Sequence, residues 1–284
     1  YQNGARFSQT LYPNIGRLRS FATGGAVAVI LITNGVPVPV AMLASLACGV
    51  LAGVVTGLLH TLLGIPGILA SILTQISLYS VNLNILGGKA NVAVSVDRFP
   101  LMVSLRFIPK TILISVLFTV VIVLIAYWYF GTEQGSAIRA TGSNPNMSKA
   151  QGININAMTV LTLGISNGIV ALSGALLSQY QGFADINMGR GAIVIGLAAV
   201  IIGEVLGHAV FGKDMNFMVK MFCVVFGGVI YYIVIGIVLW LKMPTNDLKL
   251  FTAIIVAIFL AVPYLKSKAN SSFKKAAKRG GTNQ

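Results

Sequence analysis

Charged residues are scarce in this 284-residue chain, of which only 9% is Asp, Glu, Lys or Arg. Soluble domains are about one quarter charged, so the chain lacks the side chains that would cover a water-facing surface. Hydrophobic residues instead make up 56% of it. At roughly 20 residues per crossing, this share suffices for about eight spans, and we predict an all-α polytopic membrane protein with about 7–8 transmembrane helices.

Histidines and acids are too few for the usual catalytic and metal-binding sites. The chain has two histidines and six acidic residues. Neither His60 nor His208 has a second ligand at the spacing of a zinc site, so the sequence predicts no metal site. Cys48 and Cys223 lie in apolar runs, which favours buried free thiols over a disulfide. No nucleophile set stands out, and we expect no enzyme.

A phosphate-binding loop is also missing. Such a loop needs Gly-Lys followed by Ser or Thr, whose hydroxyl helps to hold magnesium. Here Lys89 is followed by Ala90, and Lys213 is followed by Asp214. We therefore expect no cofactor on this chain. If the protein uses ATP, then ATP and magnesium bind to a separate ATPase.

Positive charge dominates what charge there is, with a formal net charge of +14. Six of the 20 basic residues follow the final apolar run, namely Lys266, Lys268, Lys274, Lys275, Lys278 and Arg279. Basic segments beside a span stay in the cytoplasm and touch anionic lipid. We therefore place the C-terminus in the cytoplasm, and we expect a lipid bilayer rather than nucleic acid as the partner of these charges.

Proline, glycine, asparagine and charged residues separate the apolar runs. The predicted spans are 21–33, 40–63, 66–87, 107–130, 157–180, 191–211, 217–241 and 248–265. The first is short and glycine-rich, and it is either a full crossing or a half-helix or re-entrant segment. We divide the chain into a polar basic N-terminal segment, 1–20, a transmembrane domain, 21–265, and a basic tail, 266–284. The first segment has no signal peptide and does not open with Met, which fits a chain with an upstream part.

Small residues recur at the spacing of close helix contacts. Gly49, Gly53 and Gly57 form a double GxxxG pattern, and Gly203 and Gly207 repeat the spacing. Lipid offers helices no hydrophobic drive to associate, so smooth faces that let backbones approach do much of the packing. The pattern fits a contact within one subunit, which we favour, and it also fits a contact between subunits.

Polar residues inside the apolar runs are candidates for a translocation path. Glu204 lies deep in its run, and His208 follows four residues later on the same helical face, as a functional or a purely structural pair. Gln75, Asn82 and Asn167 are amides that protein or water must satisfy at membrane depth. They line either an aqueous path or a dry, hydrogen-bonded interface between helices.

The polar segment 132–152 is too long for a tight turn and falls on the cytoplasmic side. Thr132 is placed to cap a short helix that ends near Gly142. Asn144 and the following proline then turn the chain into a second short helix that starts near Asn146. The segment is either a solvated loop or a compact helical element that docks a soluble partner.

This segment resembles the cytoplasmic coupling segment of ATP-binding-cassette importer permeases of the branched-chain amino acid and ribose type. Further stretches match in the same order, and the likeness is strongest to the subgroup paired with tryptophan/tyrosine-type binding lipoproteins. The matching stretches are 56–60, 65–70, 138–147, 150–153, 166–179 and 188–204. The resemblance covers roughly 21–265, and the polar segment 1–20 departs from it.

The resemblance implies a permease subunit that works as a pair in the bacterial plasma (inner) membrane. An extracytoplasmic binding protein would deliver a small solute, namely an amino acid, with aromatic ones among the candidates. A dimer of ATPase subunits would drive alternating access. The residues implied to contact the ATPase are Arg139, Ala140, Thr141, Gly142, Asn144 and Met147. A secondary transporter driven by protons or sodium is the alternative, although the single Glu204–His208 pair is thin support for one.

Overall fold

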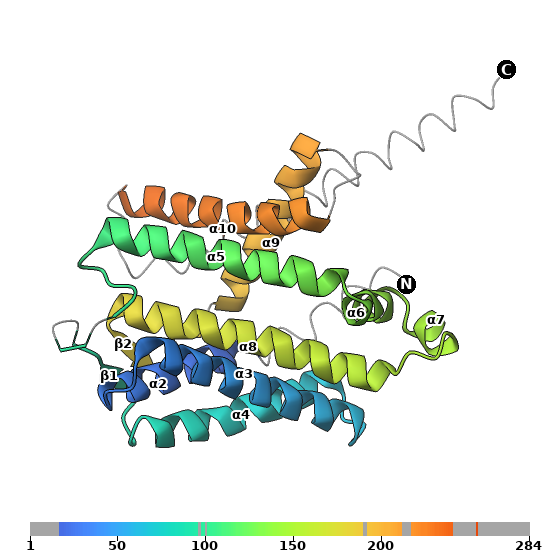
Figure 1. Cartoon of the computed structure of the whole chain (residues 1–284), viewed down its shortest axis with the longest axis horizontal. Helices are drawn as coiled ribbons and strands as arrows, with labels where there is room; N and C mark the ends of the chain where they lie inside the picture. The colour runs from blue at the N-terminus through green and yellow to red at the C-terminus, as the bar shows by residue number, and fades with distance from the viewer. Residues whose placement is uncertain are drawn as a thin grey trace. The chain divides into compact units, whose positions relative to one another are not determined.

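The computed structural model describes residues 17–95, 98–99, 101–189, 192–211, 217–240 and 254. They are mostly helical and divide into two compact units, Tyr1–Ile193 and Val194–Gln284. The described elements of the first unit are α2 (Arg17–Thr33), α3 (Val38–Thr61), α4 (Gly67–Ile85), β1 (Asn91–Ala93), α5 (Ile108–Gly131), α6 (Glu133–Ser143), α7 (Pro145–Ala150), α8 (Ile155–Gln181) and β2 (Phe183–Asp185) (Figure 1).

Proline, asparagine and glycine set several of the helix ends. Pro37 immediately precedes α3 and Pro66 immediately precedes α4. A proline just before or within the first turn sacrifices no intrahelical hydrogen bond. The side chain of Asn154 accepts a hydrogen bond from the backbone of Ala157 at the start of α8, and Gly182 ends that helix with φ 77°. These are residues of the types at which the sequence predicts the runs to separate.

The helices α2, α3 and α8 form the closely packed part of the first unit. Gly49, Gly53 and Gly57 of α3 all face α8. A Cβ atom at Gly57 would stand 2.8 Å from the Cα atom of Val160, and at Gly53 it would meet the carbonyl oxygen of Leu163. The double GxxxG pattern thus packs two helices of the same chain backbone to backbone, as such patterns do in membranes.

The helix α2 begins earlier than the predicted run 21–33. Its first described residue is Arg17, so Arg19 and Ser20 belong to the helix rather than to a polar loop. The hydroxyl of Ser20 donates a 2.9 Å hydrogen bond to Oδ1 of Asn167 on α8. A polar residue can extend the helix here because α8 supplies the partner that lipid would not.

A small two-stranded ladder closes the end of the unit opposite α6 and α7. The strands β1 and β2 pair antiparallel, with Asn91 opposite Asp185 and Ala93 opposite Phe183. Ala184 of β2 and Val94, which directly follows β1, are buried with side chains of α2 and α3 in one apolar cluster. The all-α prediction misses this ladder, because three-residue strands carry no readable periodicity.

The second unit contains α9 (Ala192–Phe211) and α10 (Phe217–Trp240). Gly203 of α9 lies against the backbone of Cys223 on α10, and Gly227 of α10 lies against that of Ala199. Tyr231 is buried in the small apolar cluster of this unit. Cys223 is a free thiol, as is Cys48 in the first unit.

Five described helices are long and apolar enough to cross a membrane. They are α3, α4, α5, α8 and most of α10, and shorter apolar helices span Arg19–Thr33 and Ala198–Gly207. The predicted polytopic helical membrane protein is therefore confirmed. The predicted span 248–265 and the tail lie outside the described residues, except for residue 254.

Candidate functional site

The predicted pair of short helices at 132–152 is present as α6 and α7. The side chain of Thr132 accepts a hydrogen bond from the backbone of Gly135, and that of Asn144 accepts one from the backbone of Met147. Both helices therefore start on a side-chain cap, which stabilises a helix by about 1 kcal/mol.

The break between α6 and α7 lies slightly away from its predicted place. Gly142 does not end α6, which runs on to Ser143, and α7 begins at Pro145 rather than at Asn146. Asn144 is both the last cap of α6 and the first cap of α7, and a proline with its fixed φ suits the first helical position. Asn144 therefore both ends α6 and starts α7, whereas the sequence predicts that Gly142 ends the first helix and that a turn precedes the second.

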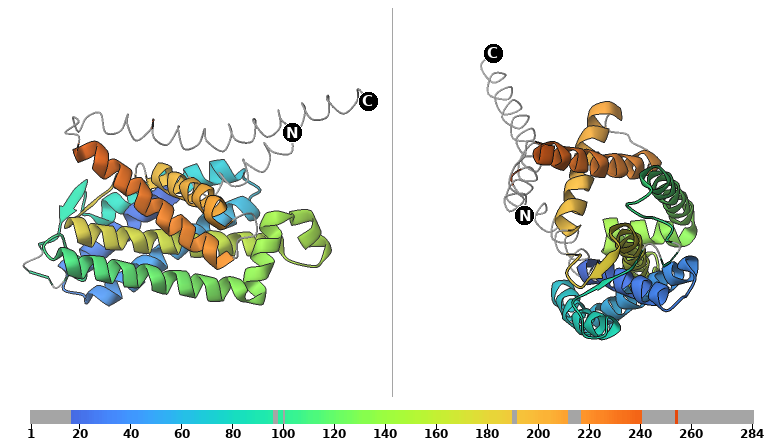
Figure 2. Two further views of the ribbon diagram at one scale, coloured as in Figure 1. Left: turned by 90° about the horizontal axis from the view of Figure 1, so that it is seen from above. Right: turned by 90° about the vertical axis from the view of Figure 1, so that its left-hand side faces the viewer.

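One face of α6 and α7 is packed and the other is exposed. Ile138 and Thr141 of α6 and Ser148 of α7 are buried. Gly135 lies against the backbone of Phe130, the end of α5. The left panel of Figure 2 shows the two helices projecting beyond the ends of the neighbouring helices of this unit.

The predicted coupling residues divide between these two faces. Four of them are exposed: Arg139, Gly142, Asn144 and Met147, the last with 59% of its surface accessible. Ala140 is half-buried and Thr141 is buried. The hydroxyl of Thr141 donates to the carbonyl of Ala137 in its own helix. Among the predicted coupling residues, a soluble partner would therefore meet the guanidinium of Arg139, the amide of Asn144 and the thioether of Met147.

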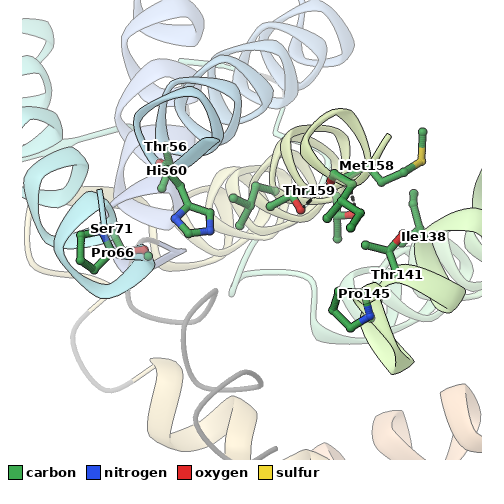
Figure 3. A pocket seen from close by; sticks show the side chains of 14 residues that line it. Thr56, His60, Pro66, Ser71, Ile138, Thr141, Pro145, Met158 and Thr159 are labelled. Carbon is green, nitrogen blue, oxygen red and sulfur yellow. Dashed lines mark hydrogen bonds between the residues drawn. The ribbon is translucent and has the colours of Figure 1, made fainter. Parts of the chain in front are cut away.

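A cavity of about 670 Å³ lies between this segment and the helices behind it. It is lined by residues from the end of α3, the start of α4, α6, α7 and the first turns of α8, as Figure 3 shows. The lining residues are Thr56, His60, Pro66, Gly67, Ser71, Ile138, Thr141, Gly142, Pro145, Ile155, Met158, Thr159, Thr162 and Leu163. The packed face of the segment is therefore not in continuous contact with the other helices.

Hydrogen bonds organise the far wall of this cavity. The hydroxyl of Thr56 on α3 is 3.0 Å from that of Thr74 on α4, which joins the two helices. Nδ1 of His60 is 2.8 Å from the carbonyl oxygen of Ile65 and so bridges the loop that connects them. Sequence reasoning missed this wall, although the matching stretches 56–60 and 65–70 contain three of its residues.

The predicted path residues of the first unit lie in different surroundings. Asn167 is 2% exposed, and both ends of its amide are satisfied, by the hydroxyl of Ser20 and the carbonyl of Leu163. Gln75 is half-buried on α4. Asn82 is fully buried, and neither polar atom of its amide has a hydrogen-bond partner among the described residues.

The predicted polar pair of the second unit remains a prediction. Glu204 is exposed on α9, in a helix whose other residues are almost all apolar. The side chain of His208 lies outside the described residues. Gly203 and Gly207, the small residues of the same helix, are both buried. Within the described part of the chain, no three His, Cys, Asp or Glu residues gather as a metal site would require.

Sequence comparison decides what kind of protein carries these features. The sequence profile described as "Branched-chain amino acid transport system / permease component" matches residues 7–263. The chain belongs to this permease family. It is thus the permease component of an ATP-binding-cassette importer and a multi-pass membrane protein, not itself catalytic, and its family uses ATP through a partner ATPase.

Relatives of the permease differ in what their names say. A "Tyrosine transport system permease protein" of Clostridioides difficile is 36% identical over 93% of the chain and 85% of its own length. An uncharacterised protein of Rickettsia prowazekii is 30% identical over 79% of the chain and 80% of its own length. An "Autoinducer 2 import system permease protein" of Salmonella paratyphi B is 29% identical over 65% of the chain and 54% of its own length. No solved structure matches the chain.

Proposed function

We propose that this permease imports an amino acid, with aromatic amino acids as the first candidates, and that residues 132–152 couple it to its ATPase. Support for the substrate comes from the relative named as a tyrosine transport permease. Support for the coupling role comes from the projecting α6–α7 segment, whose exposed face carries Arg139 and Met147.

The assembly that we propose follows from the family. Two copies of the permease surround a central path, a dimer of ATPase subunits docks on the two coupling segments, and an extracytoplasmic binding protein delivers the substrate. The segment and the basic tail 266–284 then face the cytoplasm, because basic flanks stay on that side. In this assembly each copy has 7–8 spans in the bacterial inner membrane, including the predicted 248–265.

The physical argument for coupling rests on the way the segment is built. Its two helices are short, side-chain capped and joined by a single residue, so that the segment can move as one body. A rigid element passes on a displacement that a flexible loop would absorb. Arg139 offers a planar fork of donors for a carboxylate or carbonyl of the ATPase. Loss of such a contact at an interface costs about 2 kcal/mol, or roughly thirtyfold in affinity.

The test is reconstitution of the permease with its ATPase and its binding protein in lipid vesicles. We expect Arg139→Glu and Gly142→Pro to leave the permease in the membrane while abolishing tyrosine uptake and substrate-stimulated ATP hydrolysis. Gln134→Glu is the matched control, because it adds negative charge in the first turn of the same helix, where the helix dipole favours it.

Two outcomes would contradict the proposal in different ways. Full coupling in both variants would show that the segment is only a loop. Uptake by the wild-type permease without any ATPase would instead favour the alternative, a transporter driven by protons or sodium. If the wild-type system imports another solute but no amino acid, and both variants abolish that import, then the coupling role stands and the proposed substrate class is wrong.

A further inference from the structure

The cavity behind the coupling segment has the size of a small-molecule site. Its volume of about 670 Å³ falls within the range of roughly 300–1,000 Å³ that is usual for ligand pockets. Figure 3 shows Pro66 and Ser71, at the start of α4, on one side of the cavity, and Thr141 and Pro145, from the coupling segment, on the other. A molecule in this cavity would therefore lie between the coupling segment and the helices behind it.

The threonines of the wall offer acceptors rather than donors. The hydroxyls of Thr141, Thr159 and Thr162 each donate to the carbonyl oxygen four residues earlier in their own helix, at 2.8, 2.9 and 2.6 Å. A hydroxyl group has one proton and two lone pairs. Because the proton of each group is already used within its helix, only lone pairs remain for an occupant of the cavity.

His60 adds a nitrogen acceptor to the same wall. Its Nδ1 lies 2.8 Å from the carbonyl oxygen of Ile65. A carbonyl oxygen only accepts hydrogen bonds, so Nδ1 carries the proton, and Nε2 of the neutral ring is then an acceptor. Among the described residues Nε2 has no hydrogen-bond partner. The loop between α3 and α4 thus fixes the tautomer of a ring that lines the cavity.

The described wall contains no charged side chain. None of its described residues is Asp, Glu, Lys or Arg, and Ile138, Ile155, Met158 and Leu163 supply apolar surface. Backbone N–H groups at the start of α4 have no side-chain cap, but no cation of the described wall reinforces them. Burial of a carboxylate or phosphate without a cationic partner is strongly unfavourable. The wall therefore disfavours an anion, and it also disfavours the transported amino acid with its carboxylate.

We propose that this cavity is a regulatory site for a neutral, amphipathic small molecule, which has an apolar body and one hydroxyl or N–H group that donates to Nε2 of His60. The apolar body packs against Ile155 and Met158, whose thioether makes favourable contacts with aromatic rings. The binding site stands on the geometry of the wall, whereas its effect on transport rests on the proposed coupling role of residues 132–152.

An occupant of the cavity would hold the coupling segment in its present position. The segment can move toward the start of α4 only if the cavity closes, and a cavity filled to the density of a protein interior cannot close. A ligand that binds only the open form shifts the population toward that form. At ten times its dissociation constant, this shift is about tenfold. We therefore expect the ligand to inhibit substrate-stimulated ATP hydrolysis.

The first experiment compares three probes that share one two-ring body. They are 2-naphthol, which has a hydroxyl donor, 2-methoxynaphthalene, which has none, and 2-naphthoate, which carries a carboxylate. Binding to the purified complex of permease and ATPase in detergent is measured by equilibrium dialysis. We expect 2-naphthol to bind about tenfold more tightly than the methyl ether, as the loss of one hydrogen bond predicts, and 2-naphthoate not to bind.

Variants of the wall then locate the bound probe. His60→Asn keeps a donor for the carbonyl of Ile65 and removes Nε2, so it should weaken the binding of 2-naphthol about tenfold and leave that of the ether unchanged. Met158→Trp places a ring of the protein in the cavity and should abolish the binding of both. Ile169→Trp is the matched control, because Ile169 is 36% exposed on α8 and does not line the cavity. The unfolding midpoint without any probe verifies that each variant is folded.

The outcomes separate the site from its effect on transport. Equal binding of 2-naphthol and its ether would contradict the proposed ligand class, and unchanged binding in Met158→Trp would contradict the location. Inhibition of ATP hydrolysis in the wild type that persists in Met158→Trp would show an action outside the cavity. Binding through His60 that leaves substrate-stimulated ATP hydrolysis unchanged would contradict the regulatory role. If Arg139→Glu and Gly142→Pro retain full coupling while 2-naphthol binds through His60, then the proposed coupling role fails and the binding site stands.

Discussion

The interface between α3 and α8 consists of direct backbone contacts, whereas the coupling segment is organised by hydrogen bonds from its own side chains. At Gly53 and Gly57 the two helices leave no room for a Cβ atom. In α6 a similar contact joins only the start of the helix, at Gly135, to the end of α5, whereas Gly142 has no heavy atom within 4 Å of the place where a Cβ would stand. A contact made of backbone atoms cannot adjust to a larger side chain, but a locally capped segment can shift without losing its fold. The difference supports the proposal that the three helices α2, α3 and α8 are the fixed frame and that the segment is the moving part.

Overpacking of the frame should produce the largest effect. Gly53→Val would drive methyl groups into the backbone of Leu163, which cannot rotate away as a side chain would. We expect a loss of about 3 kcal/mol in the free energy of unfolding, seen as a lower unfolding midpoint in detergent and as reduced membrane levels. Gly131→Ala is the control, because no atom lies within 4 Å of the new methyl group. An unchanged midpoint for Gly53→Val would show that the frame is looser than its contacts indicate.

Chemical accessibility should separate tightly packed positions from open ones. After replacement of Cys48 and Cys223, a cysteine at half-buried Gln75 should react with a small water-soluble thiol reagent at least about ten times faster than one at Asn167, a difference of about 1.4 kcal/mol. Asn167 lies in the α2–α8 interface, where its amide is satisfied by protein. Equal labelling of both positions in every nucleotide state would place Asn167 on an aqueous path.

Removal of the caps should weaken coupling more than stability. Thr132→Ala and Asn144→Ala each remove a side-chain acceptor from the start of a short helix, at a cost of about 1 kcal/mol. We expect lower substrate-stimulated ATP hydrolysis with little change in the unfolding midpoint of the complex. Ser136→Ala serves as control, since its exposed hydroxyl only donates to the carbonyl of Glu133. A drop in midpoint as large as that of Gly53→Val would mean that the segment belongs to the frame.

The smallest effect should come from the hydrogen bond between α3 and α4. Thr56→Val keeps the shape of the side chain and removes its 3.0 Å contact with the hydroxyl of Thr74. Such bonds between membrane helices average about 0.6 kcal/mol, so we expect a barely resolved change in midpoint. A loss several times larger would show that this pair anchors α4 to the frame. Thr159→Val, which removes a hydroxyl bonded only within α8, gives the baseline.

The sequence predicts those parts of the fold that depend on local chemistry. Apolar runs, with prolines and asparagines between them, are enough to locate the long helices, and Thr132 is recognisable as a cap because threonine is a common residue in that role. The GxxxG spacing identifies the contact face of α3. The sequence does not predict that α8 is the partner of this face, because the spacing indicates a close backbone contact but not which helix makes it.

The missed features depend on residues that are far apart along the chain. Arg19 looks like part of a basic leader until Asn167 is seen to lie beside Ser20. The cavity behind the coupling segment needs the ends of α3, α4 and α8 to meet at one level. Asn82 is predicted as a path residue from its polarity alone. Only the structure shows that its amide is buried and has no hydrogen-bond partner among the described residues.

The β1–β2 ladder has a consequence for the order of events during synthesis. Its two strands are about ninety positions apart in the sequence. At a rate of roughly 5–20 residues per second, the ribosome needs about 5–20 s after making β1 before β2 exists. For that interval α4 is in the membrane while the segment after it has no strand to pair with. The ladder can therefore form only after α8 has been synthesised, because β2 follows α8 in the chain. A mutation that slows the insertion of α8 should lengthen the time for which β1 stays unpaired and open to proteases.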